Sequence, residues 1–171
     1  MDKPRTIISA IIEKVENNEL KVFFQTRWKP IVSPAYTGLL EIPAGGVDVY
    51  EDVYDSLKRE VKEETGLDVI EIIDDYHSEI TENRPQDRSK VFRPFLCQEA
   101  VQTVDGLPWI GFVFRCRVEG EIKMDLTEAK DPQWLTINEI RNIIENKPET
   151  IFPLQFPVLK YYVDYISNLK K

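Results

Sequence analysis

The stretch of residues 45–67, GGVDVYEDVYDSLKREVKEETGL, constrains the fold of this chain more than any other. Seven of its residues together form one spaced pattern: Gly45, Glu51, Arg59, Glu60, Glu63, Glu64 and Gly66. Seven fixed residues, each at a frequency of about 7%, coincide by chance at roughly one start point in 10⁸. The spacing therefore carries both structural and chemical meaning.

Three acidic residues of this stretch share one face of a predicted helix. Residues three and four positions apart lie together on a helix, so Glu60, Glu63 and Glu64 form a carboxylate cluster near its C-terminal end. These like charges repel one another, and the helix dipole disfavours negative charge at that end. A divalent cation is the natural occupant, and oxygen ligands without nearby histidine or cysteine favour Mg²⁺ or Mn²⁺ over Zn²⁺. The alternative is a solvated acidic helix.

The opposite face of the same helix is apolar. Val53, Leu57 and Val61 recur every four residues and are expected to pack onto a core. Gly66 suits the C-terminal cap, where a left-handed backbone is easiest for glycine. Gly45 belongs to a tight loop that leads into the helix.

The composition indicates one globular domain over residues 1–171. A hydrophobic content of 42% in 171 residues is enough for a sizeable core. The net charge of −8 argues against a general nucleic-acid or membrane-surface binder. No apolar signal core occurs at residues 1–6 and no run has transmembrane length, so we expect a cytoplasmic protein.

Cysteine and histidine offer little alternative chemistry. Cys97 and Cys116 are isolated within apolar, strand-like segments and are expected to be reduced core residues, with a disulfide as the alternative. His77 is the single histidine, so a Ser–His or Cys–His triad would have to use it. Nothing else in the sequence supports such a triad.

Apolar patterning predicts strands and helices along the whole chain. Strands are expected at residues 6–15, 20–25, 39–42, 69–73, 95–101, 108–118 and 133–135. The first strand should be buried on both faces, and it should form a hairpin with the second. In 108–118 the core-facing set should be Ile110, Phe112, Phe114, Cys116 and Val118. Thr136 and Glu139 form a capping box for a helix to about residue 146, and a last helix is expected at 154–169.

Basic residues outside the acidic helix are candidates for substrate binding. Arg27 and Lys29 follow the second strand and could contact a phosphate or a base, with a solvated loop as the alternative. The polar stretch 81–90 is predicted to be a mobile loop. Its Arg84 could attract a phosphorylated substrate, again with a solvated loop as the alternative.

With its complete glycine, arginine and glutamate spacing, the chain resembles the Nudix hydrolases over nearly its whole length. The resemblance implies an α/β fold, specifically an α/β/α sandwich with a mixed sheet. It also implies hydrolysis of a nucleoside diphosphate linked to another moiety, with a divalent metal. By that match Glu60, Glu63 and Glu64 are metal-binding residues, the Ala44 carbonyl is a further ligand, and the structural residues are Gly45, Glu51, Arg59 and Gly66.

The implied chemistry requires a general base as well as a metal. The metal would neutralise the diphosphate and activate a water molecule, which a carboxylate must deprotonate. Glu63 is a candidate within the helix, and Glu64 belongs to the same catalytic cluster. Glu128, in the polar loop 124–132, is the other candidate, because some related enzymes use a glutamate in that loop. A solvated loop carboxylate is its alternative.

The substrate is suggested by residues 41–45, which resemble the ADP-ribose and nucleotide-sugar branch and include Glu41 as a substrate-binding candidate. One feature of that branch is not matched. The branch tends to carry a proline at a set distance beyond the glycine and glutamate pattern, and Pro85 lies a few residues later than that. Two alternatives remain: a nucleoside-triphosphate hydrolase of the pool-cleaning type, and a non-catalytic domain that senses a nucleotide. The expected partner is a small nucleotide rather than nucleic acid or membrane, and a homodimer is compatible with the sequence.

Overall fold

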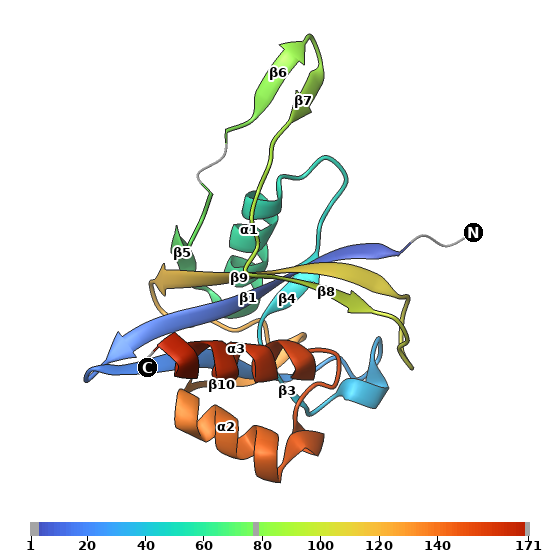
Figure 1. Ribbon diagram of the computed structural model, residues 1–171. Coiled ribbons are helices and arrows are strands. Elements are labelled where there is room, and N and C mark those ends of the chain that lie inside the picture. The colour runs from blue at the N-terminus through green and yellow to red at the C-terminus, as the bar shows by residue number, and fades with distance from the viewer. Residues whose placement is uncertain (1–3, 77–78, 170–171) are drawn as a thin grey trace.

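The structure is a computed structural model that describes residues 4–76 and 79–169 (Figure 1). Its strands are β1 (Arg5–Glu16), β2 (Glu19–Arg27), β3 (Leu40–Glu41), β4 (Ala44–Gly46), β5 (Asp68–Ile72), β6 (Thr81–Arg84), β7 (Asp87–Ser89), β8 (Leu96–Ala100), β9 (Trp109–Glu119) and β10 (Ala129–Thr136). Its helices are η1 (Pro34–Tyr36), α1 (Val53–Thr65), α2 (Ile137–Asn146), η2 (Pro148–Thr150) and α3 (Phe156–Leu169). His77, on which a catalytic triad would depend, lies outside the described residues.

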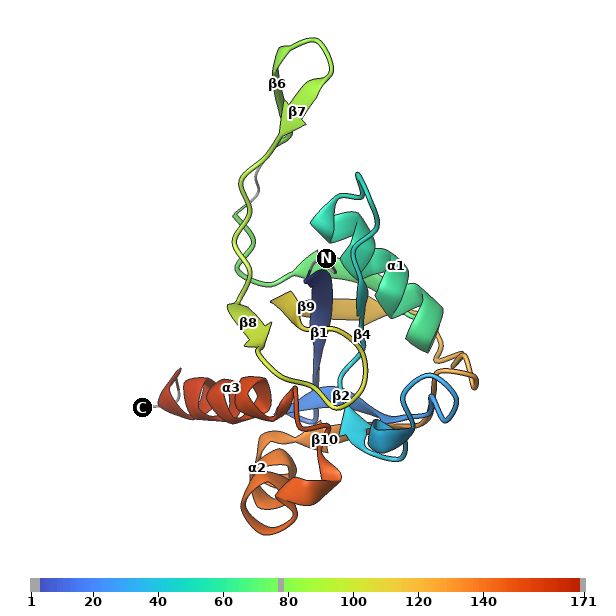
Figure 2. The ribbon, with the colours of Figure 1, turned by 90° about the vertical axis from the view of Figure 1, so that its right-hand side faces the viewer.

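A mixed sheet lies between two helical layers. Its strand order is β10-β2-β1-β9-β5, and β3, β4 and β8 add to it by pairing with β2, β1 and β9. β1 runs parallel to β9 and antiparallel to β2. Figures 1 and 2 show α1 on one face of the sheet and α2 with α3 on the other. The predicted α/β/α sandwich with a mixed sheet is confirmed.

Strand β1 supplies both hydrophobic cores. Ile8 and Ile12 pack with Leu57 and Val61 of α1, whereas Ile11 packs in the cluster formed by α2 and α3. Alternate side chains of a strand point to opposite faces, so a run of apolar residues is what a strand covered on both sides requires. The prediction that this strand is buried on both faces is confirmed.

Helix α1 begins and ends where its sequence indicates. Asp52 is the N-cap and accepts a hydrogen bond from the backbone N–H of Tyr54 at 2.8 Å. Gly66 is the C-cap, with φ of 78° in the left-handed region, and its N–H donates to the Lys62 carbonyl. Any side chain at Gly66 would also come within 2.7 Å of the Lys123 backbone nitrogen. A glycine is therefore required there.

Strand β9 departs from the predicted alternation. Val113 and Arg115 are buried although they were expected to face away from the core, and Ile110 is 47% exposed. The reason is that α3 covers the second face of β9, so that Val113 packs in the same cluster as Tyr162. Ile110 lies on the other face of β9, with Phe112 and Phe114, but it stands near the start of the strand and is not part of the cluster that packs against α1 there. The predicted core-facing set was therefore incomplete, because it left out Val113 and Arg115 on the second face, and it was wrong for Ile110.

The two cysteines are free thiols in different environments. Cys116 is fully buried on β9, as predicted, but Cys97 is exposed on β8. Both thiols are free in the structure, and the core placement predicted for Cys97 is wrong. Cys97 and Glu99 alternate along β8 with the more buried Leu96, Gln98 and Ala100, and so lie on the exposed face of this strand.

The polar stretch predicted as a loop contains a second small sheet. β6 and β7 pair antiparallel, with Glu82 opposite Arg88, and every residue of both strands is exposed. Figure 1 shows this hairpin projecting from the body of the protein. Its strands lack apolar alternation, which is why the sequence pattern did not reveal them.

The C-terminal elements follow the sequence closely. Thr136 and Glu139 form the predicted capping box, with the Thr136 backbone N–H donating to Glu139 at 2.8 Å. β10 begins at Ala129, earlier than predicted, because a bulge between Lys130 and Gln133 lets the strand continue.

Among residues 4–76 and 79–169, no helix has the length and apolar character needed to cross a membrane.

Candidate active site

A pocket of about 460 Å³ opens where two antiparallel neighbours of β1 separate. β4 pairs with residues 7–9 of β1, whereas β2 pairs with residues 13–16. The pocket walls come from β1, β2, β4, α1 and the loops that precede β9 and β10. Of the residues that the sequence singled out, those lining the pocket are Arg27, Lys29, Ala44, Gly45, Glu60, Glu63, Glu64 and Glu128.

Gly45 lies directly against the carboxylate of Glu60. A side chain at Gly45 would come within 1.9 Å of the Glu60 carboxyl carbon, closer than any real contact. The missing side chain therefore allows α1 to lie against β4 with Glu60 between them. Burial raises the pKa of the Glu60 carboxyl, although Arg59 opposes the shift by donating a hydrogen bond of 2.6 Å.

Glu64 is the most buried carboxylate of the cluster, with an exposed fraction of 2%. Its Oε2 accepts hydrogen bonds from Gln25 Nε2 at 2.8 Å and from the Ala44 backbone N–H at 3.3 Å. Burial, reinforced by the negative charge of Glu41, raises the pKa of the Glu64 carboxyl to about 8. Its charge is thus only partly compensated by the surrounding residues.

Arg59 joins the helix to the glycine loop. Its Nε and Nη2 each donate to Glu51 at 2.8 Å, and Nη2 also donates to the Gly46 carbonyl at 2.9 Å. These hydrogen bonds hold the pKa of the Glu51 carboxyl at about 2. Arg59 and Glu51 therefore connect α1 with the loop that precedes it, and their structural roles stay predictions. Glu63 is also within reach of Arg59, at 3.2 Å, but its side chain is 61% exposed.

Arg27, the last residue of β2, and Lys29, just beyond it, are both paired with carboxylates. Arg27 Nη1 donates to Glu41 at 3.0 Å, and Glu41 lies behind Arg27 rather than in the pocket wall. Lys29 Nζ donates to Glu128 at 2.6 Å and lies 3.9 Å from Glu64 Oε1. Lys29 therefore links the loop carboxylate to the cluster on α1.

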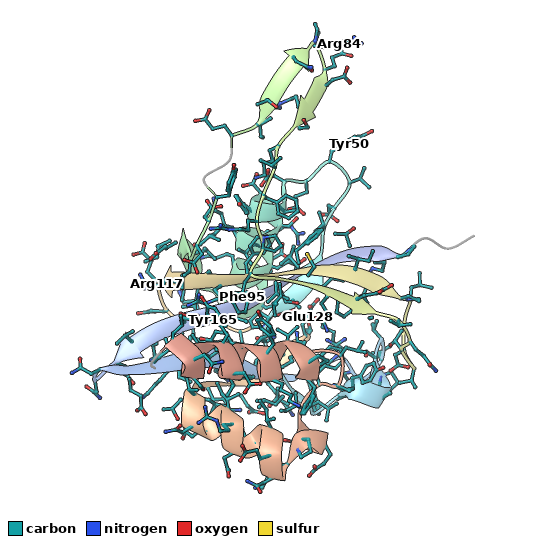
Figure 3. The ribbon with its side chains drawn as sticks, in the orientation of Figure 1. Tyr50, Arg84, Phe95, Arg117, Glu128 and Tyr165 are labelled. Atoms are coloured by element: carbon teal, nitrogen blue, oxygen red, sulfur yellow. The ribbon has the colours of Figure 1, made fainter. Side chains whose placement is uncertain are left out.

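Arg84 does not join this group. It lies at the outer end of the β6–β7 hairpin, whereas Glu128 lies beside the sheet (Figure 3). Arg84 is exposed and does not line the pocket. The structure therefore gives its predicted role in substrate binding no support, because the loop expected to bring it close is an outward-pointing hairpin.

Several pocket residues were missed by the sequence reasoning. Arg5 at the start of β1 contributes a further cation, and Tyr36, Trp109 and Phe152 contribute aromatic side chains. These residues come from four separate segments, so no local spacing could group them. Gln25, which lies behind the pocket and contacts Glu64, could be recognised in the sequence only as a polar residue at the end of an apolar run, which lies buried in β2.

The side chains of this cluster offer oxygen donors suited to a divalent cation. Within the described ranges, no three acidic, cysteine or histidine side chains already converge as a metal site. Arg59 instead pairs with both Glu60 and Glu63. The carboxylates of Glu60 and Glu64, whose pKa values burial raises, nevertheless provide hard oxygen donors in need of positive charge, and the Glu60 carboxylate occupies the space that a side chain at Gly45 would fill. The residues therefore fit a divalent cation.

Comparison with known proteins decides the family. The model of the NUDIX domain family matches residues 5–155. This chain belongs to the Nudix family. An RNA pyrophosphohydrolase of Campylobacter jejuni subsp. jejuni serotype O:23/36 (strain 81-176) is 28% identical over 124 residues, which cover 71% of this chain and 72% of the relative. The chain is accordingly a Nudix pyrophosphohydrolase, and Nudix enzymes generally use divalent metal ions.

Solved structures share the Nudix fold. The MutT protein from Methanosarcina mazei Go1 superimposes with a TM-score of 0.63 at 20% identity, covering 98% of both chains. The NUDIX domain of Shewanella oneidensis NrtR, complexed with ADP ribose, has a TM-score of 0.63 at 11% identity and covers 97% of this chain and 90% of its own. At these identities the likeness concerns the fold.

Proposed function

We propose that this Nudix enzyme hydrolyses the pyrophosphate bond of a nucleoside diphosphate linked to a second moiety, with ADP-ribose or a nucleotide sugar preferred. Glu60, Glu63, Glu64 and the Ala44 carbonyl would hold the divalent cation. Mg²⁺ is the proposed ion and Mn²⁺ its alternative, because both prefer oxygen donors. The proposal rests on the incompletely compensated Glu64 carboxylate in the wall of an extended pocket.

The rest of the pocket suits an extended nucleotide. Tyr36, Trp109 and Phe152 offer aromatic surface for a base or a ribose, and Arg5 and Lys29 offer positive charge for phosphates. A ligand that fills both parts can use the binding energy of its second half to orient the diphosphate. This argument supports a diphosphate with substituents at both ends.

The proposed catalytic roles divide between two carboxylates. A bound divalent cation supplies neutralisation of the charge that develops on the diphosphate. Glu128 would accept the proton of the attacking water at its carboxylate, and Lys29, 2.6 Å away, would hold that carboxylate in position. Glu63, largely exposed beside Arg59, is the other candidate base. The pH–rate profiles of Glu128→Gln and Glu63→Gln separate them, since only loss of the base removes the acidic limb.

The substrate proposal is tested with a panel at saturating Mg²⁺. ADP-ribose, nucleotide sugars, dinucleoside polyphosphates, nucleoside triphosphates and a 5′-triphosphorylated RNA oligonucleotide are compared by kcat/KM. We expect ADP-ribose or a nucleotide sugar to lead. A triphosphate ahead by tenfold or more, about 1.4 kcal/mol of transition-state discrimination, would overturn the proposal.

A second candidate is hydrolysis of a 5′-triphosphate, on a nucleotide or an RNA end. It is favoured by the 28% identity to the Campylobacter jejuni RNA pyrophosphohydrolase, and the same panel tests it. The third alternative, a domain that binds a nucleotide without turnover, is disfavoured by the complete carboxylate set. Such a cluster costs stability and serves no purpose in binding alone.

A further inference from the structure

Gln25 on β2 contacts the carboxylate cluster from behind the pocket. It is fully buried, and its Nε2 lies 2.8 Å from Glu64 Oε2 and 3.5 Å from Glu41 Oε1. It does not line the pocket, so it cannot touch a substrate there. Any role in the reaction must therefore act through Glu64.

The two oxygens of Glu64 have different surroundings. Oε2 accepts from Gln25 and from the Ala44 backbone N–H at 3.3 Å. Oε1 has Lys29 Nζ at 3.9 Å, beyond hydrogen-bonding distance. Two donors on one oxygen fix the plane of the carboxylate and leave Oε1 available to a ligand.

Gln25 is itself held in place. It lies opposite Glu41 in the register of β2 and β3, and Arg27 donates to Glu41 at 3.0 Å. A continuous series of contacts therefore runs from Arg27 through Glu41 and Gln25 to Glu64. Since β2 and β3 are fixed by their backbone pairing, this series is anchored on the sheet.

The other end of the amide argues against a purely structural role. Within the described part of the chain, the buried Oε1 of Gln25 has no hydrogen-bond partner. A buried acceptor without a partner costs free energy, and an apolar side chain of similar length would avoid that cost. What an apolar side chain cannot supply is the donor to Glu64.

We infer that Gln25 is a positioning residue that orients Glu64 for the divalent cation. The inference rests on the proposed function, in which Glu64 is a metal ligand. Outer-shell partners of metal ligands fix ligand orientation, and their loss typically weakens metal affinity by 10–100-fold.

The test is the affinity for Mn²⁺ alone, measured by calorimetry on the parent and on Gln25→Met. Methionine keeps the length of the side chain and removes the donor. We expect the affinity of Gln25→Met to fall by about 10–100-fold. Gln25→Asn, which is one methylene too short to reach Glu64, should show the same loss and serves if the methionine variant does not fold.

Gln98→Met is the matched control. Gln98 on β8 is a partly buried glutamine whose Nε2 donates to the backbone carbonyl of Leu154, and its Oε1, like that of Gln25, lacks a partner among the described residues. It does not line the pocket, so Gln98→Met should bind Mn²⁺ like the parent. Parental affinity in a folded Gln25 variant would overturn the inference. Absence of Mn²⁺ binding by the parent would instead overturn the proposed metal site itself.

Discussion

Two buried glutamates of this protein, Glu13 and Glu64, differ in how their charge is compensated. Arg115 Nε donates to Glu13 Oε1 at 2.6 Å and its Nη2 donates to Oε2 at 3.3 Å, and Tyr162 donates to Oε1 at 2.9 Å. Glu64 has amide donors and a lysine at 3.9 Å, and its pKa is raised to about 8.

The difference separates a structural charge from a functional one. When the fold pairs a buried carboxylate with a guanidinium, the negative charge is compensated within the protein. Removing either partner should then destabilise the protein. A buried carboxylate that the fold leaves short of positive charge is a candidate ligand for a cation supplied from outside. Glu13 is the first kind and Glu64 the second.

The largest effect should follow from breaking the complete pair. Arg115→Met leaves Glu13 buried without its cation, so the free energy of unfolding should fall by about 3–5 kcal/mol. Chemical denaturation measures this loss. The kcat of the folded fraction should remain unchanged, since Arg115 does not line the pocket. A loss under about 1 kcal/mol, the range of an exposed pair, would contradict the structural role.

The second effect concerns activity rather than stability. Glu64→Gln removes one charge from the cluster, so kcat/KM should fall by at least about 100-fold, the upper range seen for outer-shell partners of metal ligands. Its melting temperature should equal or exceed that of the parent, because repulsion from Glu41 and Glu60 is relieved. Hydrolysis and melting are measured on the same preparation, and unchanged turnover would remove Glu64 from the site.

The smallest effect is expected outside the pocket. Arg84→Ala on the exposed hairpin should change kcat/KM by no more than about twofold, because Arg84 does not line the pocket. Lys29→Ala, by contrast, should lower kcat/KM by about tenfold or more, because a hydrogen bond to a charged group contributes about 1.5–3 kcal/mol. A loss of about tenfold in Arg84→Ala, as large as that expected for Lys29→Ala, would show that the hairpin does reach the substrate.

The sequence predicted what is local and missed what is distant. The cap, the apolar stripe and the carboxylates of α1 follow from residues that lie three or four positions apart, so spacing reveals them. The contacts of Glu13 with Arg115 and Tyr162 span 102 and 149 residues, and that of Gln25 with Glu64 spans 39. Such contacts depend on strand order and register, which apolar patterning does not specify.

The same limit explains the errors in individual elements. β9 was assigned one core face because its alternation was regular, but α3 covers the other face and buries Val113 and Arg115. The β6–β7 hairpin is fully exposed, so it has no apolar alternation to detect. Arg27 and Lys29 were found as cations, yet their pairing with Glu41 and Glu128 required the fold.

The proposed metal site predicts that the carboxylate cluster around Glu64 binds a divalent cation from solution. Its most direct test is the melting temperature with and without Mg²⁺, for the parent and for the double variant Glu60→Gln with Glu64→Gln. At 100 times the dissociation constant, binding stabilises the parent by about 2.7 kcal/mol. For a domain of this size that corresponds to a rise of roughly 5–10 °C. We expect this rise in the parent and none in the double variant; an equal rise in both would contradict the claim.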